Sequence, residues 1–407
     1  MPIEERPGET QVCVIGGGPA GVIAAYLFAL RGISVVLLEG KNDFDRDFRG
    51  DTLHASSLEV LEQLGVVDEI LEQATSKIQK LSLTFADTEI DIADFCAMQT
   101  KYAYVAIIPQ VLFLNHIVEK AKKLDCFSVL MGAQVRALEE INGKVSGVHY
   151  TLNGEEQILP AKLVIGADGR GSSARRLANI KLGKTSPPMD IVWFRLALPD
   201  GEKIEDVNGR IGAGTMIVII GRKDHLQVGF VIMKGGYKAL REKGIDSFHQ
   251  TVSQLAPELS TVITAIKDWS EMAILSVVTG RAEQWYKDGL LLIGDAAHIM
   301  SPVGGVGINY AIQDAVAAVN LLTDPIKQNH LDTNDLARVQ KRREPAVIVI
   351  QSFQSLIQRR VIRAALKLDA SLSPPLPLRI ISKFPFARKK IAHFLAYGRN
   401  HEKVDGL

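Results

Sequence analysis

Three short apolar runs in this chain each end in a turn that contains glycine, and this arrangement constrains the fold more than any other feature. They are residues 12–21 (VCVIGGGPAG), residues 163–169 (LVIGADG) and residues 290–298 (LLLIGDAAH). Short apolar runs bounded by turn residues are typical of strands buried on both faces of a parallel sheet. Their order and spacing indicate that the three motifs belong together.

The first turn has the G-x-G-x-x-G spacing of a dinucleotide-binding unit. Gly16 allows the sharp turn, Gly18 lets the backbone approach a pyrophosphate, and Gly21 permits close packing of helix on strand. The helix that follows, which includes Ala20, offers unpaired N–H groups and a partial positive charge to an anion. Glu39 ends the next apolar run, 18 residues after Gly21, where a carboxylate can accept both hydroxyls of a ribose. We therefore expect a dinucleotide at this turn.

The remaining pattern changes character along the chain. Between about residues 181 and 275, β-type runs follow one another without helices, which predicts an antiparallel sheet inserted between two halves of a nucleotide-binding domain. Beyond residue 332 the pattern is helical, apart from the proline-rich residues 373–377. Helices are predicted at 22–30, 111–123 and 308–322, a hairpin at 81–92, and strands at 34–38, 129–138, 145–150, 191–198, 216–220 and 227–233.

Composition narrows the class of protein. The chain of 407 residues is 47% hydrophobic and 23% charged, as in soluble globular enzymes. It has no apolar run of spanning length, no signal-peptide pattern and no cysteine spacing typical of metal sites, so we expect a cytoplasmic protein without a metal centre. From Lys341 onward, 14 Lys or Arg residues stand against four acidic residues. This basic region is either a solvated helical face or a weak membrane contact, and we expect no nucleic-acid partner.

The three motifs together resemble those of the group A flavin-dependent monooxygenases, the p-hydroxybenzoate-hydroxylase-like aromatic hydroxylases. The resemblance covers roughly residues 11–322. It implies an α/β fold in which a Rossmann-like FAD-binding domain carries an inserted, mostly antiparallel β-sheet substrate domain and a helical C-terminus. The expected boundaries are 1–76, 101–180 and 272–325 for the FAD-binding domain, 77–100 and 181–271 for the substrate domain, and 326–407 for the helical C-terminal region.

The resemblance also implies roles for individual residues. Asp295, after Gly294, is similar to the acid that holds a ribityl hydroxyl of FAD. Asp168 with Gly169 and Arg175 resembles a fingerprint that serves both FAD and the nicotinamide cofactor. Helix N-terminal amides after residue 301 would stabilise negative charge on the flavin. The further cofactor contacts implied are Arg49, for which Arg46 is a competitor, Gln110, Pro302, Gly305, Gly307, Ile308 and Asn309, and of these Arg49, Pro302 and Gly305 are the catalytic candidates.

The implied reaction uses NADH or NADPH to reduce FAD and then O2, through a C4a-hydroperoxyflavin, to hydroxylate an aromatic or other hydrophobic small molecule. The protein must exclude water and aim the substrate. If a phenol has to lose its proton, His225 or His54 is the candidate base. The candidate substrate contacts on the inserted sheet are Trp193, Arg195, Met216, His225 and Phe230, with Phe194 and Tyr237 as further candidates.

Several alternatives stay open at this point. They are an FAD-dependent reductase, a quinone- or prenyl-lipid-pathway hydroxylase at a membrane surface, and a non-catalytic FAD-binding redox sensor. A flavin halogenase is disfavoured because Trp193, Trp269 and Trp285 are far apart, and a disulfide reductase because no cysteine pair has the required spacing. About 85 residues follow Leu322, too few for a thioredoxin-like domain, so we expect a shorter helical C-terminus. We expect a monomer or a homodimer.

Overall fold

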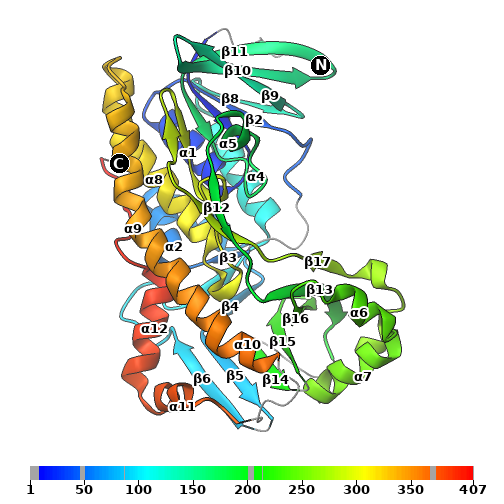
Figure 1. Ribbon diagram of the computed structural model, residues 1–407. Helices are drawn as coiled ribbons and strands as arrows, with labels where there is room; N and C mark the ends of the chain where they lie inside the picture. Colours follow the sequence, from blue (N-terminus) through cyan, green and yellow to red (C-terminus); the bar gives the residue numbers. More distant parts are fainter. Residues whose placement is uncertain are drawn as a thin grey trace.

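The computed structural model describes residues 9–45, 51–86, 88–199, 206–212, 214–366 and 373–406 (Figure 1). Arg46 and Arg49 lie outside the described residues. Two large sheets lie at opposite ends of the molecule, and the long helix α9 (Thr333–Ile357) runs along one side of it (Figure 1).

The first large sheet aligns the three glycine motifs. β1 (Thr10–Ile15) pairs in parallel with β2 (Val35–Glu39) and with β11 (Glu155–Gly166). β11 pairs in parallel with β20 (Leu290–Leu292) and β2 with β8 (Phe127–Met131). All three motif strands therefore end at the same edge of the sheet. Three antiparallel strands complete this sheet, namely β9 (Gln134–Ile141), β10 (Lys144–Leu152) and β19 (Tyr286–Lys287).

Helices pack beside this sheet. α1 (Pro19–Leu30) packs against α4 (Gln110–Ala121) and α8 (Gly307–Lys327). The alanines and aliphatic side chains of α1 are buried almost throughout, which explains why this stretch of sequence shows no polar face. The shorter helices beside it are α2 (Ala55–Gln63), α3 (Val67–Leu71) and α5 (Ser173–Leu177).

The second large sheet is the predicted insertion. Its order is β17-β13-β16-β15-β14-β5-β6, and every neighbouring pair is antiparallel except β14 and β5, which run in parallel. The bounds are β5 (Lys80–Phe85), β6 (Thr88–Asp94), β13 (Met189–Ala197), β14 (Val207–Gly212), β15 (Thr215–Gly221), β16 (His225–Met233) and β17 (Ala273–Leu275). One face of it packs under α7 (Ile245–Leu255), where Phe194, Phe230 and Phe248 meet edge to face.

Smaller elements connect the two large sheets. One small sheet contains β3 (Thr52–Leu53), β7 (Val105–Ile107) and β4 (Ser76–Ile78), and the other contains β12 (Leu182–Thr185), β18 (Thr279–Ala282) and β21 (His298–Ile299). The remaining short helices are α6 (Tyr237–Glu242) and the 3₁₀ turns η1 (Pro257–Leu259), η2 (Ile263–Ala265), η3 (Trp269–Glu271), η4 (Gly294–Ala296) and η5 (Val303–Gly305).

The C-terminal region is helical, as predicted. α9 begins at a capping box in which Asp332 accepts backbone hydrogen bonds, and it continues into a π-helical turn, η6 (Gln358–Ile362), and α10 (Arg363–Ala365). α11 (Leu376–Lys383) starts within the proline-rich run that the sequence suggested as a break, because proline is well tolerated in the first helical turn. α12 (Pro385–Tyr397) follows and packs against β6.

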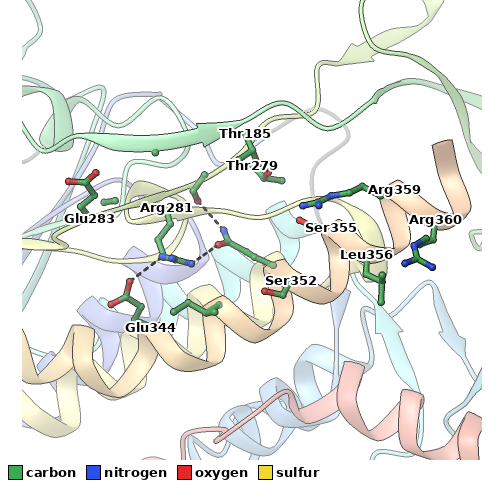
Figure 2. A pocket seen from close by; sticks show the side chains of 15 residues that line it. Thr185, Thr279, Arg281, Glu283, Glu344, Ser352, Ser355, Leu356, Arg359 and Arg360 are labelled. Carbon is green, nitrogen blue, oxygen red and sulfur yellow. Dashed lines mark hydrogen bonds and ion pairs between the residues drawn. The ribbon is translucent and has the colours of Figure 1, made fainter.

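α9 forms one wall of an open cavity of about 830 Å³, whose other wall is β12 and β18 (Figure 2). Arg281 of β18 makes an ion pair with Glu344 at 3.1 Å and donates a hydrogen bond to the Gln351 side chain at 3.3 Å. The Gln351 amide in turn donates to the backbone carbonyl of Gly280 at 3.0 Å. These contacts fix α9 against the strand pair.

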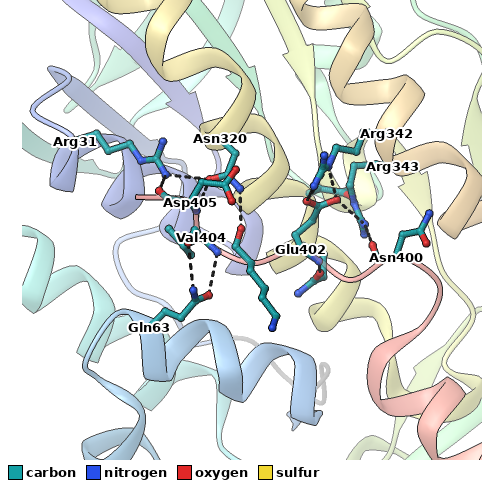
Figure 3. Close-up of polar contacts among 12 residues, drawn as sticks. Arg31, Gln63, Asn320, Arg342, Arg343, Asn400, Glu402, Val404 and Asp405 are labelled. Carbon is teal, nitrogen blue, oxygen red and sulfur yellow. Dashed lines mark hydrogen bonds and ion pairs between the residues drawn. The ribbon is translucent and has the colours of Figure 1, made fainter. Parts of the chain in front are cut away.

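The last residues of the chain lie across α8, α9 and α2 (Figure 3). Glu402 is buried, and both of its carboxylate oxygens accept from Arg342 Nε at 2.9 Å. The neighbouring Arg343 lies 3.6 Å from Glu402 and donates to the buried Asp314 of α8 at 2.9 Å. A buried ionic chain therefore links the C-terminal segment to the interior of α8.

Two arginines on α9 provide a direct test of this ionic chain. Arg343→Ala removes the buried cation that joins Asp314 to Glu402 and leaves Asp314 with His298 and Glu402 with Arg342, so we expect the free energy of unfolding to fall by roughly 3–5 kcal/mol. Arg338→Ala removes an exposed ion pair with Asp335 and should cost at most about 1 kcal/mol. Urea unfolding of both variants measures the difference. Equal losses would show that the buried chain contributes no more than a surface pair.

Candidate active site

A cavity of about 660 Å³ lies where the three motif strands end. Its volume is in the range usual for sites that bind small molecules and cofactors. One part is lined by the glycine motifs of the first sheet, and another by residues of the second sheet. The sequence-predicted residues on its walls are Gly16, Gly18, Ala20, Glu39, Gln110, Asp168, Gly169, Trp193, Asp295, Pro302, Gly305, Gly307 and Ile308.

The N-terminus of α1 points its backbone donors at this cavity. Its N-cap residue, Gly18, lacks a capping side chain, and no acidic side chain lies in the first turn. A Cβ atom on Gly18 would find its nearest neighbour, Ala167 O, at 3.9 Å, so the space beside it is open. Gly21 differs, because its Cβ would lie 1.9 Å from Gly16 O. Gly18 therefore faces the cavity, whereas Gly21 serves the packing of α1 on β1.

Glu39 lies at the end of β2, as predicted, and its carboxylate lines the cavity. Oε2 accepts from the backbone N–H of Gly17 at 2.7 Å, and Oε1 accepts from that of Lys41 at 2.9 Å. These bonds fix the carboxylate beside the glycine turn. Gln110, at the start of α4, also lines the cavity.

The middle motif is held by its own side chains. Asp168 Oδ2 accepts from Ser173 N at 2.6 Å and from Ser173 Oγ at 2.7 Å, so this carboxylate caps the start of α5 while it also lines the cavity. Arg175 is buried outside the cavity wall. It donates to the carbonyl of Ala296 at 2.7 Å and to that of Arg170 at 3.0 Å, so it ties the second motif to the third.

The third motif is fixed from behind by α8. The fully buried Asp314 accepts from Gly294 N at 3.0 Å and from His298 Nε2 at 2.5 Å. Although burial acts to raise it, the contacts with His298 and Arg343 hold the pKa of Asp314 below its usual value. Asp295, which directly follows Gly294, lines the cavity with Arg170 3.9 Å away.

The glycine loop before α8 is anchored to β3. Gly305 has a φ of +63°, and its carbonyl accepts from Thr52 Oγ1 at 2.6 Å, while a Cβ would lie 2.7 Å from the same hydroxyl. Asn309 is buried rather than cavity-lining. Its Oδ1 accepts from His54 N at 2.8 Å and from Ser57 Oγ at 2.7 Å, which joins α8 to α2.

The part of the cavity nearer the second sheet has a polar cluster that sequence reasoning missed. The buried Arg222, after β15, makes an ion pair with Asp51 at 2.7 Å and donates to Gln227 of β16. Trp193 lies over Gly229 on the neighbouring strand, where any Cβ would approach its ring to about 2.9 Å. The cavity-lining residues not predicted from sequence here are Asp51, Thr52, Ile220, Arg222, Gln227, Leu275, Val277, Val278 and Met300.

Four of the five predicted substrate contacts lie away from this cavity. Phe230 packs in the core under α7, and Met216 lies in the apolar cluster behind Trp193, outside the cavity wall. Arg195 is exposed, and His225 pairs with Asp224 at 2.7 Å on the β15–β16 hairpin. Strand alternation accounts for Phe230, which pairs with Val192 and so points to the opposite face of the sheet from Trp193. By the same register, Arg195, Met216 and His225 share the face of Trp193 but occupy other positions on it.

The residues that line this cavity fit the chemical groups of FAD. The open space beside Gly18 and the unpaired donors of α1 suit a pyrophosphate, and the Glu39 carboxylate suits a ribose. Asp295 and the N-terminus of α8 line the continuation of the same cavity, where a ribityl chain and ring would follow. The 830 Å³ cavity beside α9 contains none of the predicted site residues.

Comparison with known proteins gives a consistent result. The family described as "FAD binding domain" matches residues 9–347. The 6-methylpretetramide 4-monooxygenase of Streptomyces rimosus is 31% identical over 391 residues, covering 96% of this chain and 92% of that protein. Pentachlorophenol 4-monooxygenase of Sphingobium chlorophenolicum is 25% identical, covering 76% of this chain and 57% of the relative, so the chain spans little more than half of that longer protein.

A solved structure shares the fold. The crystal structure of p-nitrophenol 4-monooxygenase from Pseudomonas putida superposes with a TM-score of 0.78 at 18% identity, covering 97% of this chain and 100% of that one. The sheet-inserted α/β architecture is thus common to both chains.

The glycine turn can be tested without disturbing the fold. Gly18→Ala places a methyl group in open space, so we expect thermal stability of the FAD-free protein to be unchanged while FAD affinity falls by at least about tenfold, a loss of ~1.4 kcal/mol. Gly21→Ala is the contrasting variant and should destabilise the protein by roughly 1–3 kcal/mol or more through overpacking. Thermal unfolding and fluorescence titration with FAD measure both. Normal FAD affinity in Gly18→Ala would show that the pyrophosphate does not bind at this turn.

His54 gives a pH-dependent prediction. Burial lowers its pKa to about 4, so the folded protein binds fewer protons than the unfolded chain between that value and about 6.5. The free energy of unfolding should therefore fall by up to about 3 kcal/mol as the pH drops from 7 to 4 through this window. In His54→Gln the free energy of unfolding should no longer show this fall between pH 7 and pH 4. In the control His330→Gln, which replaces an exposed histidine, the fall should remain. Urea unfolding at several pH values measures this dependence. The same pH dependence of the free energy of unfolding in both variants would contradict the lowered pKa of His54.

Proposed function

This chain belongs to the FAD binding domain family, and from that premise we propose that its 660 Å³ cavity holds FAD and an aromatic substrate side by side. The chain is an FAD-dependent monooxygenase that uses NAD(P)H and O2, and the resemblance to the group A flavin monooxygenases is confirmed. The alternatives of a reductase, a lipid-pathway hydroxylase and a redox sensor are not favoured by the relatives it matches. The single observation that carries the proposal is that one cavity unites all three motifs with the face of the inserted sheet.

We assign the cofactor end of the cavity to the first sheet. Gly16, Gly18 and the α1 N-terminus would bind the pyrophosphate, and Glu39 would bind the ribose of the adenosine. Asp295 would accept from the ribityl hydroxyls. When bound, FAD supplies the redox chemistry, since it takes a hydride from NAD(P)H and activates O2 so that one oxygen atom enters the substrate and the other leaves as water. We also propose that the FAD-binding domain comprises residues 1–76, 101–180 and 272–325, the substrate domain residues 77–100 and 181–271, and the helical C-terminal region residues 326–407.

The protein's own residues would orient the substrate and exclude water. Ile220, Leu275 and Val277 provide apolar walls, and Trp193 provides an aromatic one. These surfaces suit a flat ring and leave little for water to bind. Arg222, fixed by Asp51 and Gln227, is the cation on this side and would orient an oxygen-bearing group of the substrate.

The loop before α8 would lie against the reacting ring. Pro302, Gly305 and Gly307 line the cavity, and the α8 N-terminus directs its first N–H groups to the same place. These donors would hold negative charge on the reduced cofactor. His54 is buried outside the cavity wall and neutral at pH 7, and His225 lies on the hairpin, so neither is retained as a base near the substrate. A monomer or homodimer, a cytoplasmic location and a weak membrane contact stay predictions.

The test is an anaerobic reduction of the FAD-loaded protein by NADH and by NADPH, followed by oxygen, across single-ring and polycyclic phenols. We expect one aromatic class to accelerate flavin reduction and to yield a product one oxygen atom heavier. Asp295→Ala should lose FAD during dialysis, whereas Glu283→Ala, which lines the other cavity, should retain it. Absence of reduction by either nicotinamide with every phenol, in protein that retains FAD, would contradict the proposed substrate class.

A further inference from the structure

α11 and the start of α12 present large apolar side chains to solvent. Leu376 and Ile380 are spaced by four residues and so share one side of α11, with exposed fractions of 69% and 50%. Phe384, in extended backbone at the junction of α11 and α12, is 59% exposed. Phe386, two residues further, is 66% exposed. No other Phe among the described residues is exposed. We call these four side chains the α11–α12 face.

The fold does not need this face for its own packing. Leu378, on the opposite side of α11, is buried in a cluster with Val361, Ile362 and Leu366 of the preceding helical turns. Arg388 of α12 is bonded to Asp91 of β6 at 3.0 Å, which fixes the helix pair to the second sheet. The inner side therefore anchors α11 and α12, while the outer side stays apolar and exposed. Large apolar side chains exposed on neighbouring turns, as here, favour an interaction site.

Positive charge surrounds the face. Residues 373–399 contain six Lys or Arg residues and no Asp or Glu. Arg379, Lys383 and Lys390 are exposed beside the apolar side chains, and Lys390 Nζ lies 4.4 Å from the centre of the Phe386 ring. The preceding helical turn adds Arg359, Arg360 and Arg363, which are also exposed.

We infer that the α11–α12 face docks on an anionic lipid surface. Exposed phenyl and aliphatic groups can enter the boundary between headgroups and acyl chains, while lysines and arginines beside them contact lipid phosphates. The docking is peripheral, since no helix of the described residues has the length and apolar content to cross a bilayer. A symmetric contact between two copies through this face would bring like charges together, which disfavours a second copy as the occupant. Docking of this kind would locate the enzyme at a bilayer, whichever substrate it uses.

The test uses the FAD-loaded full chain in flotation with phosphatidylcholine vesicles, with and without phosphatidylserine. We expect binding only when phosphatidylserine is present, weakened by salt because the charges are screened. The double variant Phe384→Ser/Phe386→Ser should bind at least about tenfold more weakly, since both rings lose their apolar burial. Lys383→Glu/Lys390→Glu should weaken binding to phosphatidylserine vesicles and leave the apolar side chains in place.

The matched control is Ile141→Ser/Ile158→Ser, which removes two apolar side chains that are 58% and 56% exposed on strands of the first sheet. It should bind vesicles like the unmodified protein. Absence of binding to phosphatidylserine vesicles at low salt, or equal loss in both serine double variants, would overturn the inference. So would a dimer in light scattering that only the phenylalanine variant abolishes, because the face would then bind a second copy. Flavin content and NAD(P)H oxidation, measured in parallel, should be unchanged in every variant, so failure of docking is distinguishable from failure of the proposed function.

Discussion

The buried carboxylate of Asp314 holds the parts of the site together. It accepts hydrogen bonds from Gly294 N, from His298 and from Arg343, which come from a cavity turn, a strand and a C-terminal helix. A charge removed from water is stable only when it is paired and hydrogen-bonded. All three donors must therefore be in place together, and the Asp295 turn takes its position from residues far away in the sequence. Glu402 extends the same dependence to the end of the chain.

Sequence reasoning succeeded where the constraint is local. The turns at Gly16, Asp168 and Gly294 each follow a buried strand within a few residues, and parallel pairing necessarily brings their ends to one edge. The turn at Asn142 and Gly143 between β9 and β10 is local in the same sense, because asparagine and glycine are the residue types that accept the positive φ angles found at both positions. In each case the residue type and its neighbours fix the conformation, so distant contacts are not needed to predict it.

The substrate side could not be predicted in this way. Arg222 follows a strand in a turn, where a charged residue is usually solvated, and its burial results from Asp51, which is 171 positions away along the chain. Phe230 and Met216 have the apolar character expected of a substrate contact, but core packing requires the same character. The alternation of the strand would have separated Trp193 from Phe194, but which face meets the cavity is decided only when the two sheets pack together.

The C-terminal helix α9 also shapes the site, because its side chains hold the loop that carries Pro302. Gln354 accepts from Ser301 N at 3.3 Å and donates to the carbonyls of Ser301 and Val303 at 3.0 and 2.9 Å. Gln358, one turn further, donates to Ser301 Oγ at 2.6 Å. A glutamine amide has both a donor and an acceptor, so it can satisfy a loop backbone that has no partner strand. The loop that carries Pro302 is therefore held by α9, which lies beyond the three glycine motifs in the sequence, and the geometry of the cavity depends on the helical region as much as on the sheet.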